Sequence, residues 1–316
     1  MPNHRRSIRL AVAIALFFAA VTLATAQNTG SDSERGFAIL AAIEGPIGPA
    51  TVRHVDRVME RAQARDSEVV ILQLNTPGGL ADAMREIISE ILASPVPVIG
   101  YVAPSGAHAA SAGTYILYAT HIAAMAPGTN LGAATPIAIG GLPEAFPDRD
   151  ESPTNESSDG ERGVGTGDEQ VDGGSSPTDA MTAKATNDAV ALIRSLAEMH
   201  GRNADWAESA VREASSLSAT AALERGVIDF VARDIDEVLL AADGRTVSIG
   251  STKRVLASSG LSVVTIDMDA ITRALSVLSN PNIAIILMMI GVYGVVFEFW
   301  NPGALVPGVI GAICLT

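Results

Sequence analysis

The stretch VVILQLNTPGG, residues 69–79, decides how the chain folds. Residues 69–74 are apolar except for Gln73 and are bounded by polar residues, a pattern typical of a buried strand. The Pro77-Gly78-Gly79 turn that follows exposes backbone N–H groups with no side chain in front of them. Such N–H groups can form half of an oxyanion hole, although an ordinary strand-to-helix turn has the same composition.

A second predicted strand, residues 96–102, leads into another turn of small residues. Ser111 lies there in the run AHAASAGT, residues 107–114, where small neighbours leave room for a substrate backbone. A helix that begins at this point would direct free N–H groups toward an oxyanion formed beside the hydroxyl. The pattern indicates a nucleophilic serine; the alternative is a packed helix start in which Ser111 is an N-cap.

Strands and helices alternate around these two turns. Apolar periodicity predicts strands over residues 37–43, 69–74, 96–102 and 122–126, and helices over 50–64, 80–92 and from the serine turn through Tyr118. Alternation of this kind predicts an α/β fold with a mostly parallel sheet and helical crossovers.

The alternation stops at an acidic segment, residues 140–178. Between Glu144 and Asp179 there are 11 acidic and 2 basic residues. This composition predicts a mobile loop, with a docking signal as the alternative. Helices are predicted again over 184–200 and 204–212, then a helix capped by Ser218 that ends at Glu224, and a strand over 227–232. Residues 243–280 are predicted to be a connector, irregular from residue 251.

Both ends of the chain carry membrane-related patterns. Residues 1–26 combine a basic start, an apolar run and Ala24-Thr25-Ala26, which predicts a signal peptide, or alternatively an uncleaved anchor. Residues 283–300 carry one charge, Glu298, and are long enough to cross a bilayer. Residues 304–316 are too short to cross and are interpreted as an incomplete second segment or a re-entrant one. We expect the α/β part on the extracytoplasmic side of the plasma membrane.

Composition limits the function classes. The chain has 316 residues, 48% of them hydrophobic, which is enough for one sizeable core and membrane segments. Its single cysteine, Cys314, excludes an intrachain disulfide and a multi-cysteine metal site. The net charge of −14 argues against nucleic acid as a partner. We expect no cofactor and no metal.

A nucleophilic serine needs a general base. His121 follows the serine helix and is the plausible histidine partner, whereas His54 and His200 are predicted on helix surfaces. The chain has only two lysines, Lys184 and Lys253. Lys184 begins a helix, where a positive charge is unfavourable, and a lysine buried near a hydroxyl could accept its proton. Lys253 lies in the predicted connector.

Several stretches together resemble the NfeD family of membrane-bound serine proteases, within the Clp protease/crotonase superfamily. The matching stretches are LNTPGG (74–79), residues 107–115, MAPGTNLGA (125–133), IRSLA (193–197), GRN (201–203) and NPGA (301–304). They stand in the family's order between residues 37 and 316. The resemblance implies a Clp protease/crotonase-like domain over residues 37–242, followed by a transmembrane helix.

The resemblance also implies roles for individual residues. Ser111 matches the family nucleophile and Lys184 its general base, and the N–H groups of Gly79 and Ala112 would form the oxyanion hole. The implied substrates are hydrophobic segments of stomatin- or prohibitin-like membrane proteins, and a homo-oligomer is expected. Family members continue through further membrane helices to a small β-barrel domain, so the resemblance implies a C-terminal truncation at Thr316.

Two functions of other classes remain open. A catalytically silent scaffold could organise stomatin-like partners at the membrane; the presence of both Ser111 and Lys184 argues against it. A crotonase-type acyl-CoA enzyme would share the oxyanion hole; the predicted export argues against it, because acyl-CoA is cytoplasmic.

Overall fold

The computed structural model describes residues 36–136, 177–278, 281–300 and 305–315. The predicted signal peptide, residues 1–26, lies outside these residues, as does the acidic loop up to residue 176.

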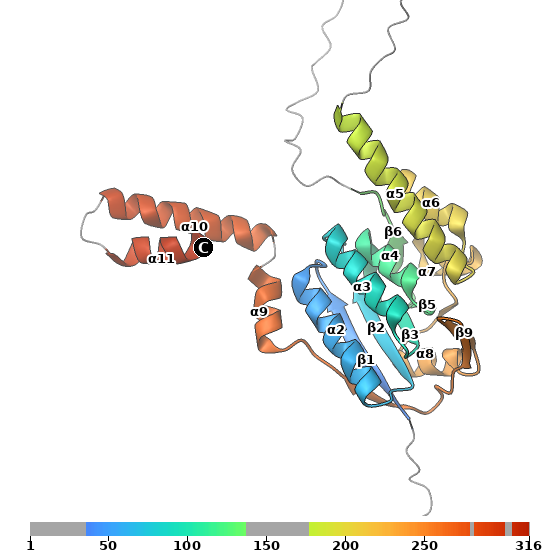
Figure 1. Ribbon diagram of the computed structural model, residues 1–316. Coiled ribbons are helices and arrows are strands. Elements are labelled where there is room, and N and C mark those ends of the chain that lie inside the picture. The colour runs from blue at the N-terminus through green and yellow to red at the C-terminus, as the bar shows by residue number, and fades with distance from the viewer. Residues whose placement is uncertain (1–35, 137–176, 279–280, 301–304, 316) are drawn as a thin grey trace, which may run out of the picture.

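A six-stranded sheet forms the centre of the molecule (Figure 1), in the order β11-β1-β2-β3-β5-β8 with every neighbouring pair parallel. Its strands are β1 (Phe37–Glu44), β2 (Val69–Asn75), β3 (Val98–Val102), β5 (Ile122–Met125), β8 (Phe230–Val231) and β11 (Ser262–Thr265). Helices α2 (Pro49–Ala64), α3 (Ala81–Ala93) and α4 (Ala112–Ala119) make the crossovers between β1, β2, β3 and β5. The predicted α/β class is confirmed.

Both faces of this sheet are buried, which explains the continuous apolar runs of its strands. In β2, Val70, Leu72 and Leu74 pack in one core with α2, α3 and α4. Val69 and Ile71 point the other way and pack against α8 (Ile235–Ala242) and the hairpin of β9 (Thr246–Ile249) and β10 (Thr252–Val255). The sheet is therefore the middle layer, as expected for parallel strands with helical crossovers.

A second group of elements lies beside α4. It contains α5 (Pro177–Met199), α6 (Ala204–Arg212) and α7 (Ala219–Glu224). It also contains a small sheet of β4 (His108–Ala110), β6 (Asn130–Gly132) and β7 (Ser216–Ser218). The helix expected from residue 184 begins at Pro177, and its first turns project beyond the rest of the domain (Figure 1). The Ser218 hydroxyl accepts the Ala221 N–H, so the predicted cap of α7 is confirmed.

The prediction of an irregular connector from residue 251 is wrong, because this segment has regular structure. It contains β10, then β11, which pairs in parallel with β1 and completes the central sheet, and then α9 (Ala270–Leu278). The side chains of β11 are exposed, so its sequence lacks the alternation of a half-buried strand. The strand predicted over 227–232 is also shorter than expected and forms only at Phe230–Val231.

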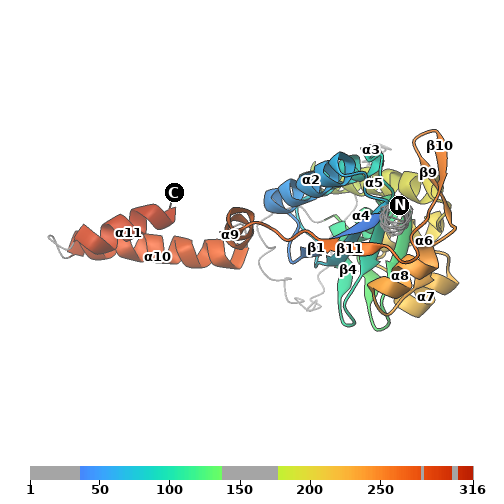
Figure 2. The ribbon, with the colours of Figure 1, turned by 90° about the horizontal axis from the view of Figure 1, so that it is seen from below.

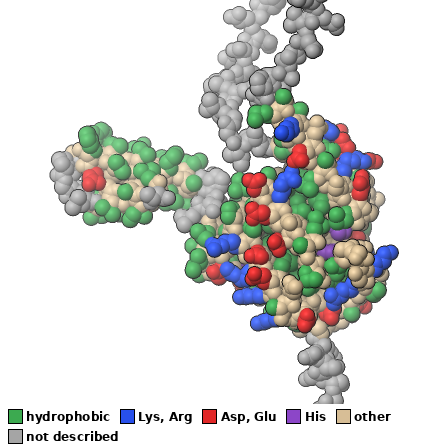
Figure 3. All heavy atoms as spheres, viewed as in Figure 1, with side chains coloured by type: hydrophobic (Ala, Val, Ile, Leu, Met, Phe, Trp, Pro, Cys, Tyr) green, Lys and Arg blue, Asp and Glu red, His purple; other side chains and the backbone are tan. Residues whose placement is uncertain are grey.

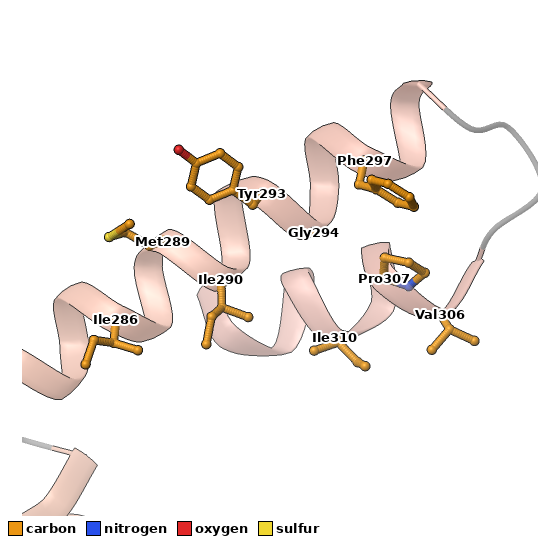
Figure 4. A pocket seen from close by; sticks show the side chains of 9 residues that line it. All are labelled: Ile286, Met289, Ile290, Tyr293, Gly294, Phe297, Val306, Pro307 and Ile310. Carbon is orange, nitrogen blue, oxygen red and sulfur yellow. The ribbon is translucent and has the colours of Figure 1, made fainter.

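The C-terminal part is a helical hairpin of α10 (Pro281–Trp300) and α11 (Leu305–Leu315), which extends away from the α/β domain next to α9 (Figure 2). Residues 283–300 have a mean hydropathy of 2.2 and are long and apolar enough to cross a membrane. The helices pack through glycines: a Cβ on Gly294 would lie 2.5 Å from the Pro307 carbonyl oxygen. An apolar groove of about 650 Å³ runs between them (Figure 4).

The predicted surface position is wrong for His54 and incomplete for His200, which is half-buried. The sequence pattern places His54 on the surface of α2, but its side chain is fully buried, and within the described residues neither ring nitrogen has a partner. The segment that follows β11 covers this side of α2: His54 shares a cavity with Ile266 and Asp267. His200 is also predicted at a surface, but its ring packs against that of His121, with centroids 5.8 Å apart.

The His121–His200 pair lies at the amino-terminal edge of the sheet. His121 Nδ1 accepts the N–H of Val98, the first residue of β3, at 3.1 Å. Burial and the nearby Arg202 guanidinium lower the pKa of both rings to about 4. Arg202 is buried and paired with Asp229 at 3.2 Å.

These lowered pKa values predict how stability depends on pH. Between pH 6.5 and 4 the two histidines are protonated in the unfolded chain but neutral in the folded one. The free energy of unfolding is therefore highest above pH 6.5 and decreases as the pH falls toward 4. We expect the melting temperature of the chain in detergent to fall between pH 7 and pH 5. His200→Gln should flatten this dependence. Circular dichroism melts at several pH values measure it, and a pH-independent melt of the unsubstituted chain would contradict the expectation.

Candidate active site

Ser111 occupies a strained turn between β4 and α4. Its φ of 49° and ψ of −117° are rare for a residue with a side chain. A serine in a sharp strand-to-helix turn presents its hydroxyl outward, as in nucleophile elbows. Ser111 is the N-cap residue of α4 by position, but its hydroxyl makes no capping hydrogen bond. The Ser111 hydroxyl therefore does not act as a helix cap, which was the alternative role.

The glycine turn after β2 lies directly against Ser111. The Thr76 hydroxyl accepts the Gly78 N–H at 3.0 Å and donates to the Gly78 carbonyl oxygen at 3.2 Å, which closes the turn. Gly78 has a φ of +116°, and a Cβ there would come within 2.7 Å of the Ser111 Cβ. Only glycine leaves enough room for the two turns to meet.

Backbone hydrogen bonds hold the two turns together. The Thr76 N–H donates to the His108 carbonyl at 2.8 Å, and the Ala110 N–H donates to the Thr76 carbonyl at 3.0 Å. The end of β2 is thus paired in parallel with β4, the strand that leads into Ser111. The two turns predicted from separate parts of the sequence form one site.

The two turns open into a cavity of about 260 Å³ between α3, α4 and α5. It is lined by Gly79, Ala81, Met84, Arg85, Ser111, Ala112, Tyr115, Ala134, Pro136, Ala185, Asp188, Ala189 and Leu192. No described residue accepts a hydrogen bond from the Gly79 or Ala112 N–H. Both groups are therefore available to a ligand beside the Ser111 hydroxyl.

Lys184 is on α5 but does not line this cavity. Its side chain is exposed, whereas Ala185 and Asp188, one residue and one turn further along the helix, are lining residues. The structure thus brings together Gly79, Ser111 and Ala112 but leaves Lys184 at the margin. His121 is excluded as a partner of Ser111, because its ring is bound at the amino end of β3. Ser111 instead follows β4, which is bonded to the carboxyl end of β2, the parallel neighbour of β3.

An ion pair crosses the cavity. Arg85 on α3 pairs with Asp188 on α5, so it fastens the projecting helix to the domain. Beside them the Tyr115 hydroxyl donates to the Ala134 carbonyl at 2.9 Å, and burial raises the pKa of Tyr115 well above its usual value. Sequence patterns contain no signal for Arg85 and Asp188, because they are far apart in the chain and each has the pattern of an exposed helix position.

The rest of the described structure offers no comparable chemistry. Within the described ranges, no group of three or more His, Cys, Asp or Glu side chains could hold a metal ion. The larger groove on the α10–α11 hairpin is lined by Ile286, Met289, Ile290, Tyr293, Gly294, Phe297, Val306, Pro307 and Ile310, none of which is an activated nucleophile (Figure 4).

The sequence is similar to two family models and to characterised proteins. Residues 40–145 match the NfeD1b N-terminal domain, and residues 282–316 match the NfeD integral membrane domain. The chain is 34% identical to the membrane-bound protease PH1510 of Pyrococcus horikoshii over 98% of its own length and 61% of that protein's length. It is 37% identical to the membrane protein NfeD1b of Bacillus subtilis, over 29% of this chain and 20% of that one.

Solved structures of 1510-N, a membrane protease from Pyrococcus horikoshii, have the same fold. A lysine-to-alanine variant of this membrane-bound stomatin-specific protease, in complex with a substrate peptide, has a TM-score of 0.61 and 34% identity. It covers 77% of this chain and 97% of its own. A serine-to-alanine variant has a TM-score of 0.58 and 35% identity, covering 73% and 98%.

The contact between Gly78 and Ser111 can be tested by adding one methyl group. Gly78→Ala should destabilise the fold more than Gly201→Ala, because Gly201 also has a positive φ but a Cβ added there would meet nothing within 4 Å. Gly201→Ala reports the backbone cost alone, about 1–2 kcal/mol. Urea unfolding measures both, and equal losses would show that the two turns do not touch.

Proposed function

Because the chain belongs to the NfeD family, we propose that it is a membrane-anchored serine endopeptidase with Ser111 as nucleophile and Lys184 as general base. One observation carries the proposal: the strained Ser111 turn lies against the Gly78 turn, and Gly79 and Ala112, whose N–H groups have no partner among the described residues, line the same cavity as Ser111. A structural serine would have no need of this arrangement, since strain of this kind is retained mainly at functional sites.

The proposed reaction has two half-reactions. Ser111 Oγ attacks the peptide carbonyl carbon while its proton passes to the neutral Lys184 amine. The carbonyl oxygen becomes an oxyanion that accepts hydrogen bonds from the Gly79 and Ala112 N–H groups. Lys184 then returns the proton to the departing amine, which leaves an acyl-enzyme. Water, deprotonated by Lys184, attacks this ester and releases the acid and the serine.

Lys184 has to approach Ser111 for this chemistry. It is on the projecting first turns of α5, where most side chains from residue 180 to residue 188 are exposed (Figure 1). A substrate segment laid over the cavity would contact these turns and draw them toward Ser111. Covering the amine would also remove water from it, which favours its neutral form.

The substrate proposal rests on the cavity and on the relatives. Met84, Ala189 and Leu192 give the cavity an apolar wall that suits a hydrophobic side chain. The 1510-N structures are described as specific for a stomatin homologue. We propose hydrophobic segments of stomatin- or prohibitin-like membrane proteins as substrates, cleaved on the extracytoplasmic side of the plasma membrane by a homo-oligomer.

The domain boundaries are proposed with one revision. The signal peptide is residues 1–26, and the protease domain begins at residue 37 and includes the acidic loop, residues 140–178. Because β11 completes the central sheet, the domain extends beyond residue 242 to Thr265.

One observation favours a second candidate. Lys184 is exposed and outside the cavity, as a catalytically silent scaffold for stomatin-like partners would allow. Comparing peptide cleavage by the unsubstituted chain with cleavage by variants of Ser111 and Lys184 distinguishes the protease from the scaffold.

Cleavage of an apolar peptide by the full chain in lipid nanodiscs tests the dyad. Ser111→Ala and Lys184→Ala should each reduce kcat/KM by at least about 100-fold, the usual contribution of a general base. Lys253→Ala is the matched control, since Lys253 is the chain's other lysine and is exposed on β10. Equal cleavage by all forms would refute the dyad, and no cleavage of a broad set of apolar peptides would favour the scaffold.

The Arg85–Asp188 ion pair predicts a compensating pair of substitutions. Asp188 follows Lys184 by four residues, so Arg85→Met would leave its carboxylate free to pair with the Lys184 side chain and hold that side chain away from Ser111. We expect kcat to fall about twofold to fivefold, the effect of an ion pair worth roughly 0.5–1 kcal/mol.

Adding Asp188→Asn to Arg85→Met should restore kcat, because the competing charge is removed. Arg233→Met, which breaks an exposed ion pair with Glu237 on α8, is the control for loss of an arginine. If the double variant is as slow as Arg85→Met, the ion pair acts only by holding α5 in place.

A further inference from the structure

The short helix α9 presents its polar side to the α/β domain and its apolar side to solvent. Thr272 is 2% exposed, and Ser276 lines the cavity that α9 shares with α2. About 100° around the helix from these two residues, Ile271 is 70% exposed and Leu275 is 38% exposed, and their spacing of four residues puts both on one face. A helix on the surface of a water-soluble domain has the reverse orientation.

The chain connects this apolar face closely to the membrane helix. Leu278 ends α9 and Pro281 begins α10, so their Cα atoms lie at most about 11 Å apart. The apolar span begins at residue 283. Since the headgroup region is only about 5–7 Å thick on each side of the hydrocarbon core, α9 lies within or next to it.

The polar side of α9 is firmly attached to the domain. Arg57 on α2 forms an ion pair of 2.7 Å with Asp269, the residue before α9. The Thr272 hydroxyl and Arg57 hold the pKa of Asp269 at about 2, so this carboxylate stays charged under all physiological conditions. Figure 2 shows α9 between α2 and the α10–α11 hairpin.

We propose that α9 lies in the lipid–water interface with Ile271 and Leu275 inserted into the bilayer, and that the Arg57–Asp269 pair thereby holds the α/β domain at a fixed position against the membrane. The occupant is the bilayer because the apolar face is continuous with the membrane helix. The proposal does not depend on the protease activity.

The sheet topology gives this attachment a consequence for the site. All strands of the central sheet are parallel, so their carboxyl ends share one edge. At this edge β11 leads to α9, β2 leads to the Gly78 turn, and β4, which is bonded to the end of β2, leads to Ser111. The edge that is attached to the membrane is also the edge that carries the cavity. Figure 3 shows the side chains of the domain and of the apolar hairpin in the view of Figure 1.

Nitroxide labels on single cysteines test where α9 lies. Cys314→Ser removes the chain's only cysteine, and the full chain is reconstituted in phosphatidylcholine nanodiscs. Labels at Ile271→Cys and Leu275→Cys should be more accessible to oxygen, which partitions into lipid, than to a water-soluble nickel complex. Leu240→Cys is the matched control, because Leu240 is a leucine on α8 that is 66% exposed. It should show the opposite preference.

Two outcomes would overturn the proposal. If the labels on α9 behave like the Leu240 label, the apolar face is in water. If they are shielded from both reagents, a protein covers the face instead of lipid.

A second measurement tests the fixed position without a label on α9. A donor dye at Leu240→Cys and acceptor lipids in the nanodisc report the distance of the domain from the bilayer. The paired replacement Ile271→Gln and Leu275→Gln should lower the transfer efficiency, because the domain would then move away from the surface. An unchanged efficiency would show that α9 does not position the domain.

Discussion

The pairing of Thr76 with β4 is the constraint on which the candidate site depends. Two backbone hydrogen bonds join the end of β2 to the strand before Ser111, and the Thr76 hydroxyl closes the glycine turn from the same position. The donors and the hydroxyl are therefore held by the backbone and not by mobile side chains. Preorganisation of this kind is what makes an oxyanion hole effective, since no donor has to reorient during the reaction.

The strain at Ser111 has to be compensated by the surrounding structure. A residue in such a backbone conformation costs about 1–3 kcal/mol. The Ser111 N–H donates to the Gly132 carbonyl at 3.0 Å, so β6 holds the turn from a second side. Behind it, α4 is buried along its whole length, and its close contact with β3 requires Gly100, where a Cβ would lie 2.8 Å from the Leu117 side chain. The packed core thus keeps the turn in its strained form.

Local patterns in the sequence predict much of this site, and they fail where distant segments meet. Strands with two buried faces, such as β2, are continuous apolar runs, and the two small-residue turns are visible directly. The edge strand β11 escapes prediction because its exposed side chains carry no period. The burial of His54 is also missed, because the segment that covers this ring follows β11 and is far from α2 in the sequence. Arg85 and Asp188 are ordinary surface residues until the fold pairs them, and Lys184 is indicated by the family resemblance more than by its surroundings.

The late position of β11 in the chain has a consequence for biogenesis. The outer edge of β1 is covered by a strand that is synthesised after every other strand of the central sheet, and α10 follows it closely. Until β11 has been delivered, β1 presents unpaired N–H and C=O groups, which invite pairing with other chains. Completion of the sheet therefore comes just before synthesis of the membrane helix, so a chain interrupted before β11 would keep an open, aggregation-prone edge.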